Sequence, residues 1–373
     1  MKVNLAHALH PMSSTVIYTS RLGNWIAVPF RVRMRISVIA LLAISACGGP
    51  VAPSSSSSPS ALTSPTGSST LPCRLPAVLA VDRQGLRLTL GFATLPNGPV
   101  SVDGSDAIVE VGRFPAAGTS GYTPIRGTER KPVLVGGGGA TYSAAAGRWL
   151  PARPEEVAPD GLHYVYRHPD GELHVVDVTT TADRKVANPN NLNPLAFTAS
   201  GIYLTKSALL AAGLWRMDPS TLVITELVAP GDGQDWLAVT RGIAWGANSN
   251  GAMGGPAATQ ILRADVSNGR VTRPYQSPSG TSIALIAPDS IGGVLLILAG
   301  QPLSALYLRS DGTQRPVSIA SDVTALHLQG PRQADGHGIW FLGNVALARF
   351  DGDSIRIAGP AIEGLIAPAG PCT

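Results

Sequence analysis

Residues 156–178, EVAPDGLHYVYRHPDGELHVVDV, contain the repeating unit that decides the fold of this chain. A Pro-Asp-Gly turn at 159–161 precedes an apolar strand, and a second turn at 168–171 leads into another strand that ends at Asp177. Turns rich in Pro, Asp and Gly between short runs of aromatic and β-branched residues predict an antiparallel hairpin.

A strand that opens with glycine recurs along the chain, at intervals of 40, 41, 51 and 45 residues. Self-similarity at such a period indicates stacked supersecondary units. The five strands begin at Gly161, Gly201, Gly242, Gly293 and Gly338.

A strand that ends in Asp follows each glycine-led strand, at intervals of 41, 47, 46 and 40 residues. Each unit also has an apolar strand before the glycine and a short strand after the Asp, as in DPSTLVITELV after Asp218. Four antiparallel strands per unit make one blade of a β-propeller. The five aspartates are Asp177, Asp218, Asp265, Asp311 and Asp351.

The hairpin of residues 156–178 resembles those of TolB-like and WD-repeat-like β-propellers, and the resemblance covers residues 73–373. We therefore expect an all-β, six-bladed propeller, with five clear blades and one more in residues 73–152. The length of that segment leaves room for a seventh, divergent blade. The last residues, IEGLIAPAGPCT, resemble the first strands of other blades, so both ends of the domain would meet in one blade and close the ring.

Residues 1–46 form the predicted leader. Within it, a basic stretch from Arg31 is followed by 11 apolar residues up to Ala46, the layout of a secretory signal and shorter than a membrane-spanning helix. The residues before Met34 do not fit this layout, so Met34 is an alternative start. Ile44-Ser45-Ala46-Cys47 resembles the bacterial lipobox, which implies cleavage before Cys47 and lipid attachment to it.

A low-complexity segment follows the predicted lipid site. Residues 51–70 hold nine Ser, three Thr and three Pro and no charge, a composition that does not order itself. Residues 47–72 are thus interpreted as a lipidated cysteine with a flexible linker, and 73–373 as the propeller domain. The expected location is the cell envelope, lipid-anchored on the extracytoplasmic side of the membrane.

Three cysteines are present, and lipidation of Cys47 would account for the odd count. Cys73 and Cys372 lie at the two ends of the predicted domain, where a disulfide would close a very long loop and stabilise the ring. Two unpaired thiols are the alternative.

The formal charge of +4 comes from the leader. Five of the 28 basic residues precede Cys47 and no acidic residue does, so 23 basic residues remain against 24 acidic ones. A nearly neutral domain offers no basic footprint for a phosphate backbone, which excludes a nucleic-acid partner.

No catalytic or metal-binding sequence motif is present, so no catalytic residue, metal ion or cofactor is predicted. Pairing Arg167 with Glu172 would place His163 and His174 on one face of the hairpin, but no third ligand is identifiable. Both histidines are therefore interpreted as strand residues.

Four arginines precede the blade aspartates by two residues, on the same strand face. They are interpreted as making cross-blade salt bridges and packing through their stems, in preference to an anion site. They are Arg216, Arg263, Arg309 and Arg349.

The predicted working surface is the propeller face that carries the loops between second and third strands and the loops between blades. We expect a binding or scaffolding module for a protein, peptide or glycan there. The alternative is an extracellular lyase or hydrolase with its active site at the channel mouth. The candidate loops are residues 98–139, the amide-rich stretch 188–194, residues 232–236 and residues 247–260. The candidate ligand-binding residues are Asn190, Asn191, Asp232, Asp235, Trp236 and Asn248. For Trp236, burial between blades is the alternative.

The predicted anchor makes a direct test available. Replacing Cys47 with Ser is expected to abolish fatty-acid labelling and to leave the precursor uncleaved, because the peptidase acts only after lipid transfer to the sulfur. Metabolic labelling followed by gel analysis measures both effects. Unchanged labelling of Cys47→Ser would refute the assignment.

Overall fold

The computed structural model describes residues 17–19, 25–27, 71–80, 87–96, 100–102, 109–110, 140–168, 170–206, 211–232, 234–248, 258–300, 303–321, 323, 332–342, 346–360 and 365–373. The chain divides into two units, residues 1–18 with 25–68 and residues 19–24 with 69–373. The short strands β1 (Ile17–Thr19) and β2 (Trp25–Ala27) pair with each other. The predicted signal core, Cys47 and the linker up to residue 70 lie outside the described residues. No helix in the described ranges has the length and apolarity needed to cross a bilayer.

The repeating unit predicted from the glycines and aspartates is a four-stranded antiparallel sheet. Its pattern is seen in β12 (Leu192–Thr198), β13 (Gly201–Lys206), β14 (Ala211–Met217) and β15 (Ile224–Asp232), which pair in chain order. The glycine opens the second strand, and the Asp directly follows the third. The sequence pattern thus placed the strands of this blade correctly.

The other sheets of the second unit follow the same meander. An outer parallel pairing of β23 with β27 joins two four-stranded sheets into one of eight strands. The blade-forming sheets are β9 (His163–Arg167), β10 (Leu173–Asp177) and β11 (Asp183–Val186); β16 (Gln234–Thr240), β17 (Ile243–Asn248), β18 (Gln260–Asp265) and β19 (Val271–Gln276); β20 (Ser282–Pro288), β21 (Val294–Ala299), β22 (Ser304–Leu308) and β23 (Gln314–Ile319); and β24 (Arg332–Asp335), β25 (Gly338–Leu342), β26 (Ala346–Phe350) and β27 (Ser354–Pro360).

The sheet at the domain ends combines strands from both termini. β28 (Leu365–Pro368) lies beside β3 (Cys73–Ala80), followed by β4 (Arg87–Leu95), which pairs with both β5 (Val100–Val102) and β6 (Val109–Glu110).

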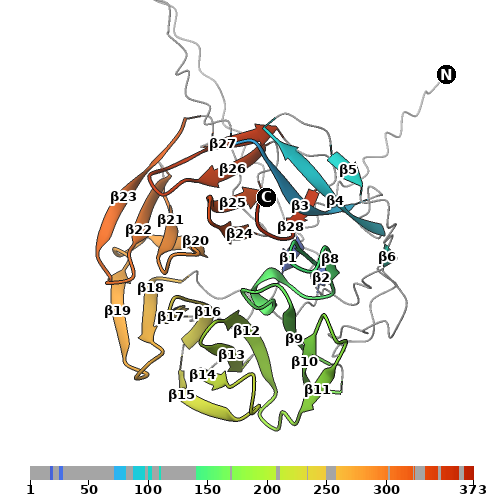
Figure 1. The fold of residues 1–373 in the computed structure, drawn as a ribbon. Helices are drawn as coiled ribbons and strands as arrows, with labels where there is room; N and C mark the ends of the chain where they lie inside the picture. Colours follow the sequence, from blue (N-terminus) through green and yellow to red (C-terminus); the bar gives the residue numbers. More distant parts are fainter. Residues whose placement is uncertain are drawn as a thin grey trace, which may run out of the picture. The chain divides into compact units, whose positions relative to one another are not determined.

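Apolar clusters between successive sheets hold the second unit together. In β9, Tyr164 and Tyr166 pack toward one neighbouring sheet, whereas Val165 packs toward the other. Strand side chains alternate between faces, so a sheet buried on both faces becomes a layer between two others. Clusters of this kind link every sheet to the next and the last to the first, and Figure 1 shows the sheets following one another around the unit. The fold is a β-propeller.

One position in the ring is occupied by a two-stranded sheet, β7 (Thr141–Ser143) with β8 (Arg148–Leu150). Trp149 of this sheet packs against β3 and β4, and Leu150 packs against β9 and β10. The described residues thus contain six blades of three or more strands, counting the eight-stranded sheet as two, together with β7–β8 in the place of the divergent seventh blade that the length of residues 73–152 allowed.

The ring is closed by the C-terminal strand and by a disulfide. β28 pairs antiparallel with β3, and Cys73 is bonded to Cys372 across 299 residues of sequence, as predicted. The backbones of Arg74 and Thr373 exchange hydrogen bonds of 2.8 and 3.1 Å. Both half-cystines are buried in an apolar cluster with Trp340 and Leu347 of the preceding blade.

Backbone geometry explains the recurring glycine. Gly338 has φ of +126°, and a Cβ there would overlap the carbonyl oxygen of Phe350 on the neighbouring strand. Only glycine accepts this conformation without strain. A glycine of this kind therefore marks, in the sequence, the tight turn between the first and second strands of a blade.

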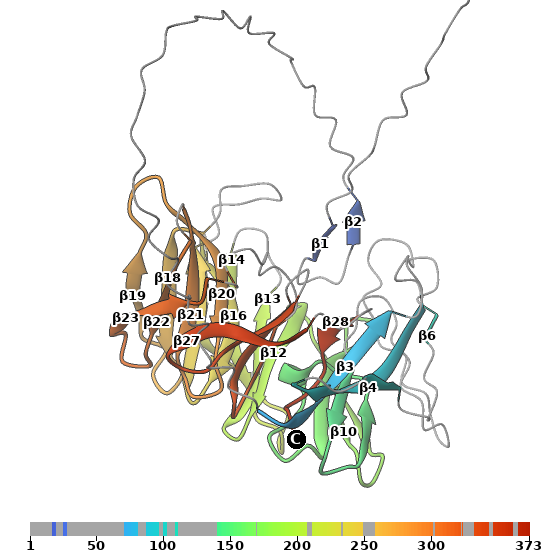
Figure 2. The same ribbon diagram turned by 90° about the horizontal axis from the view of Figure 1, so that it is seen from above.

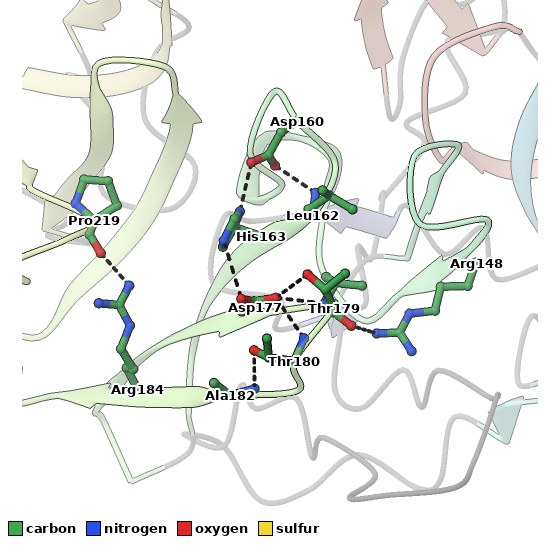
Figure 3. Close-up of polar contacts among 11 residues, drawn as sticks. Arg148, Asp160, Leu162, His163, Asp177, Thr179, Thr180, Ala182, Arg184 and Pro219 are labelled. Atoms are coloured by element: carbon green, nitrogen blue, oxygen red, sulfur yellow. Dashed lines mark hydrogen bonds and ion pairs between the residues drawn. The ribbon is translucent and has the colours of Figure 1, made fainter.

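The recurring Asp caps the turn between the third and fourth strands. Asp177 Oδ1 accepts hydrogen bonds from the Thr179 backbone (2.8 Å), the Thr179 hydroxyl (2.7 Å) and the Thr180 backbone (3.1 Å) (Figure 3). Asp218 does the same with Ser220 and Thr221. These donors lower the pKa of both carboxyls far below the usual value, with the Thr179 and Ser220 hydroxyls as the largest causes.

These turns predict a loss of stability in acid. A carboxyl whose pKa is lower in the folded state than its usual 3.8 stabilises the fold above about pH 4, and this contribution is lost as the pH falls further. Asp218→Asn keeps an acceptor oxygen but does not titrate, so its urea midpoint should fall less than that of the wild type between about pH 5 and pH 3. An identical pH dependence in the two proteins would contradict this account.

Candidate functional site

Two connections next to each other in the ring carry the candidate site. Antiparallel strands alternate in direction, so the β9–β10 turn and the β11–β12 connection lie at the same end of the sheets. We call this the loop end; the opposite end carries the Asp-capped turns. Figure 2, turned by 90° from Figure 1, shows strands from the side, so that the turns at their two ends can be told apart.

The β11–β12 connection, residues 187–191, contains the first part of the amide-rich stretch 188–194 singled out from the sequence, and we call residues 188–191 the amide loop. Its first side chain holds it in place: Asn188 Oδ1 accepts from the Leu192 backbone (2.8 Å), and Asn188 Nδ2 donates to the carbonyls of Leu192 and Gly171, both at 2.9 Å. Asn191 has a left-handed φ of +54°, which Asn adopts more readily than most residues. The amide loop is therefore fixed to the β9–β10 turn.

A guanidinium group reinforces this connection. Arg167, at the end of β9, donates to Asn193 Oδ1 and to Asn191 Oδ1, both at 3.0 Å. Arginine stays protonated at any physiological pH, so the loop end carries a fixed positive charge beside exposed amides. Asn190 and Asn191 are exposed.

A cavity of about 500 Å³ lies beside the amide loop, and we call it the amide cavity. Polar groups of Asn188, Asn190 and Glu226 line part of it, and apolar side chains line the rest. Its volume falls in the range of small-ligand pockets, roughly 300–1,000 Å³. The lining residues are Val186, Ala187, Asn188, Pro189, Asn190, Leu192, Trp215, Leu222, Ile224 and Glu226.

A second cavity of similar volume lies at the turn end of β20–β27. Its carboxylates are engaged by their own turns: Asp289 accepts from the Gly293 backbone (2.7 Å) and from the Tyr307 hydroxyl (2.5 Å), and Asp335 Oδ2 accepts from the Trp340 indole (2.8 Å). Burial, followed by the bond to Asp289, raises the pKa of Tyr307 strongly, so the phenol stays protonated. These groups stabilise turns and are not arranged as an acid and a base.

The β9–β10 hairpin has a different register from the one predicted. Arg167 lies opposite Leu173, not Glu172, so His163 faces Asp177 and His174 faces Tyr166. The turn is one residue shorter than expected, because His168 and Glu172 already pair and Gly171 takes a φ of +95°. The prediction that His163 and His174 share a face was wrong.

Each histidine has its own surroundings. His163 lies at the turn end between two carboxylates, with Nδ1 2.9 Å from Asp160 and Nε2 4.0 Å from Asp177 (Figure 3). His174 lies at the loop end and is stacked on Tyr166 at a centroid distance of 4.7 Å. The sequence did not reveal that His168 approaches His174, with ring centroids 5.1 Å apart. A three-residue turn, in place of the four-residue turn HPDG that we assumed, would have placed His168 and His174 on the same face of the hairpin.

The remaining predicted site residues occupy other connections. Trp236 is fully buried between two blades, so it contributes no exposed ring to a recognition surface. Asn248 Oδ1 accepts from the backbones of Thr259 and Gln260, which ties the base of the β17–β18 connection. Asp235 is half-buried in β16. Asp232 is the last residue of β15, and its side chain is not among those that the structure describes. Most residues of the candidate loops 98–139 and 247–260 also lie outside the described residues.

Two of the four arginines that precede the blade aspartates, Arg263 and Arg349, make structural contacts. Arg263 donates to the Ser310 carbonyl of the next blade (2.5 Å), and Arg349 is buried over the ring of Trp340. A cross-blade ion pair exists as well, but between Arg315 and Asp353 (3.1 Å).

No family model matches the sequence, and no curated protein matches it. Among solved structures, the chain is similar to TolB from Acinetobacter baumannii (14% identity, 80% of this chain and 67% of that one, TM-score 0.42). It is also similar to an oligogalacturonate lyase in complex with manganese (11% identity, 77% and 78%, TM-score 0.43). A third similar structure is the β-propeller domain of the Trilobed protease from Pyrococcus furiosus (13% identity, 56% and 70%, TM-score 0.41). Likeness at this level says nothing about the site.

The hold of Asn188 on the amide loop can be measured. Asn188→Ala removes the acceptor of the Leu192 N–H, and losing a buried partner costs about 1–3 kcal/mol. Amide hydrogen exchange at Leu192 should therefore be faster by about tenfold or more. Asn268→Ala, which removes a similar bond to the Arg270 backbone in another blade, should leave exchange at Leu192 unchanged. Equal exchange in Asn188→Ala and wild type would disprove the role of Asn188.

Proposed function

We propose that the protein is a lipid-anchored protein of the cell envelope whose propeller binds a protein, peptide or glycan at the amide cavity. The observation that carries this proposal is a cavity of about 500 Å³ that joins apolar walls to the side chains of Asn188 and Asn190 on a fixed loop.

The chemistry of the cavity suits such a ligand. Asn188 is engaged in holding the loop, whereas the side chain of Asn190 offers one acceptor oxygen and two N–H donors, which match either a peptide backbone or the hydroxyls of a sugar. Trp215, Leu222 and Ile224 supply apolar surface next to them. Because Asn188 and Arg167 already fix the loop, binding would lose little loop entropy.

The envelope location rests on the sequence and on the disulfide. The basic stretch, the apolar core and the lipobox at Cys47 follow the order of a lipoprotein signal. The bond between Cys73 and Cys372 is of the kind that persists in oxidising compartments. The Ser-rich linker would hold the domain away from the membrane surface.

The enzymatic alternative has no support among the described residues. A lyase or hydrolase needs an acid and a base that converge on one open pocket. Two carboxylates of the second cavity, Asp289 and Asp335, are instead hydrogen-bonded to backbone groups and to the side chains of Tyr307 and Trp340. We therefore propose binding as the function.

The proposal is tested by blocking the cavity. Ala187 lines it, so Ala187→Arg would fill its mouth, whereas Ala199→Arg places the same side chain on an exposed turn at the other end of the blade. Ligands would be selected on the wild-type protein from a random peptide library and a glycan array. Those ligands should bind the Ala199 variant normally and the Ala187 variant at least about tenfold more weakly, a change of 1.4 kcal/mol.

Two results would contradict the proposal. One is the absence of any selected peptide or glycan. The other is selected ligands that bind the Ala187 and Ala199 variants equally.

A further inference from the structure

Three potential metal ligands meet at the loop end of the β9–β10 hairpin: His168 and Asp170 in the turn and His174 on β10. One ligand atom from each lies within 4.8 Å of the others. We call these residues the histidine cluster. His174 is buried, His168 is about one-third exposed, and Asp170 is exposed.

His174 is oriented as metal-binding histidines are. Its Nδ1 lies 2.8 Å from Asp183 Oδ1, and because a carboxylate can only accept, Nδ1 carries the proton. In the neutral imidazole with this tautomer, the other nitrogen, Nε2, presents a lone pair. Nε2 is buried, and none of the described residues gives it a hydrogen-bond partner. An acceptor left unpaired in the protein interior is costly, so it calls for a ligand.

The turn presents the other two groups. His168 Nδ1 lies 2.7 Å from Asp170 Oδ2, while Asp170 Oδ1 accepts from the Glu172 backbone at 2.9 Å. The backbone bond from Glu172, assisted by His168, lowers the pKa of Asp170, which keeps this carboxylate ionised at neutral pH. One oxygen therefore fixes the turn, and the second faces the imidazole.

We propose that the histidine cluster is a binding site for a divalent transition-metal ion, with Zn²⁺ as the ion it fits best. Two imidazoles and one carboxylate are the ligand types of open zinc sites, in which water or a bound molecule completes the coordination. Ca²⁺ and Mg²⁺ prefer all-oxygen shells and are disfavoured by two nitrogen ligands. The contact between His174 and Asp183 is the carboxylate–histidine pair found behind many metal ligands.

Binding requires only a small rearrangement. Zinc ligands lie about 2.0–2.2 Å from the ion, so the three ligand atoms must approach one another more closely than at present. His174 is held by its neighbours, whereas His168 and Asp170 lie in an exposed turn and are able to move. The metal would bind between His168 and Asp170, in place of their direct contact of 2.7 Å.

The site does not depend on the proposed binding function, although the two are connected. The Gly171 carbonyl, in the same turn as Asp170, accepts a hydrogen bond from Asn188 of the amide loop. A metal ion that fixes the turn would therefore also stabilise the loop beside the amide cavity.

Isothermal titration calorimetry of the purified chain with ZnCl₂ tests the site. The wild type should bind one equivalent. His168→Ala should abolish binding, and Asp183→Asn should weaken it about 10–100-fold through loss of the carboxylate behind His174. His163→Ala is the matched control, since His163 is also a partly exposed strand histidine near two carboxylates, and it should bind zinc as the wild type does.

Several outcomes would overturn the proposal: no binding by the wild type, equal binding by His168→Ala, or loss of binding in His163→Ala. Preference for Ca²⁺ or Mg²⁺ over Zn²⁺ would also overturn it. Where Asp183→Asn folds poorly by circular dichroism, Asp170→Asn replaces it. That variant keeps an oxygen for the Glu172 backbone bond but loses the anionic ligand, so it should also bind zinc more weakly.

Discussion

The pairing of β28 with β3, fixed by the bond between Cys73 and Cys372, is the constraint on which the rest of the propeller depends. Each sheet buries both faces against its neighbours, so an open arc would expose one apolar face at each end. Closure removes both exposed faces at once. Because the closed loop spans 299 residues, the crosslink also restricts the unfolded chain strongly, by about 5 kcal/mol in the loop-entropy model.

The sequence was informative about the fold where the backbone demands a particular residue. A left-handed turn needs glycine, as at Gly338, and a tight turn after the third strand needs a short acceptor, as at Asp218. The Asp-capped turn recurs in five blades, and the glycine has a left-handed φ in four of them, whereas Gly293 is required by the close approach of the Tyr307 side chain. Five blades could therefore be found from the spacing of these residues. The β7–β8 sheet was not found from this spacing, and its place in the ring follows from the packing of Trp149 and Leu150.

The candidate site was predicted less well, because it depends on register and on burial. The amide loop was recognisable from its composition, and Asn190 and Asn191 are indeed exposed. A one-residue difference in turn length moved His174 to the face opposite His163 and beside His168. Since side chains alternate along a strand, such a shift changes every neighbour of a residue. Trp236 was equally ambiguous, because a tryptophan near acidic residues suits a rim or a core.

The two ends of the sheets differ in how well their polar groups are satisfied. At the turn end, the blade aspartates accept several hydrogen bonds each from their own turns. Among the described residues, five of the six buried side-chain atoms without a partner lie nearer the loop end, and Thr240 is the exception. The five belong to His174, Asn193, Gln234, Trp236 and Tyr275. Unmet polar groups cost stability, and the metal ion proposed above would satisfy one of them, Nε2 of His174.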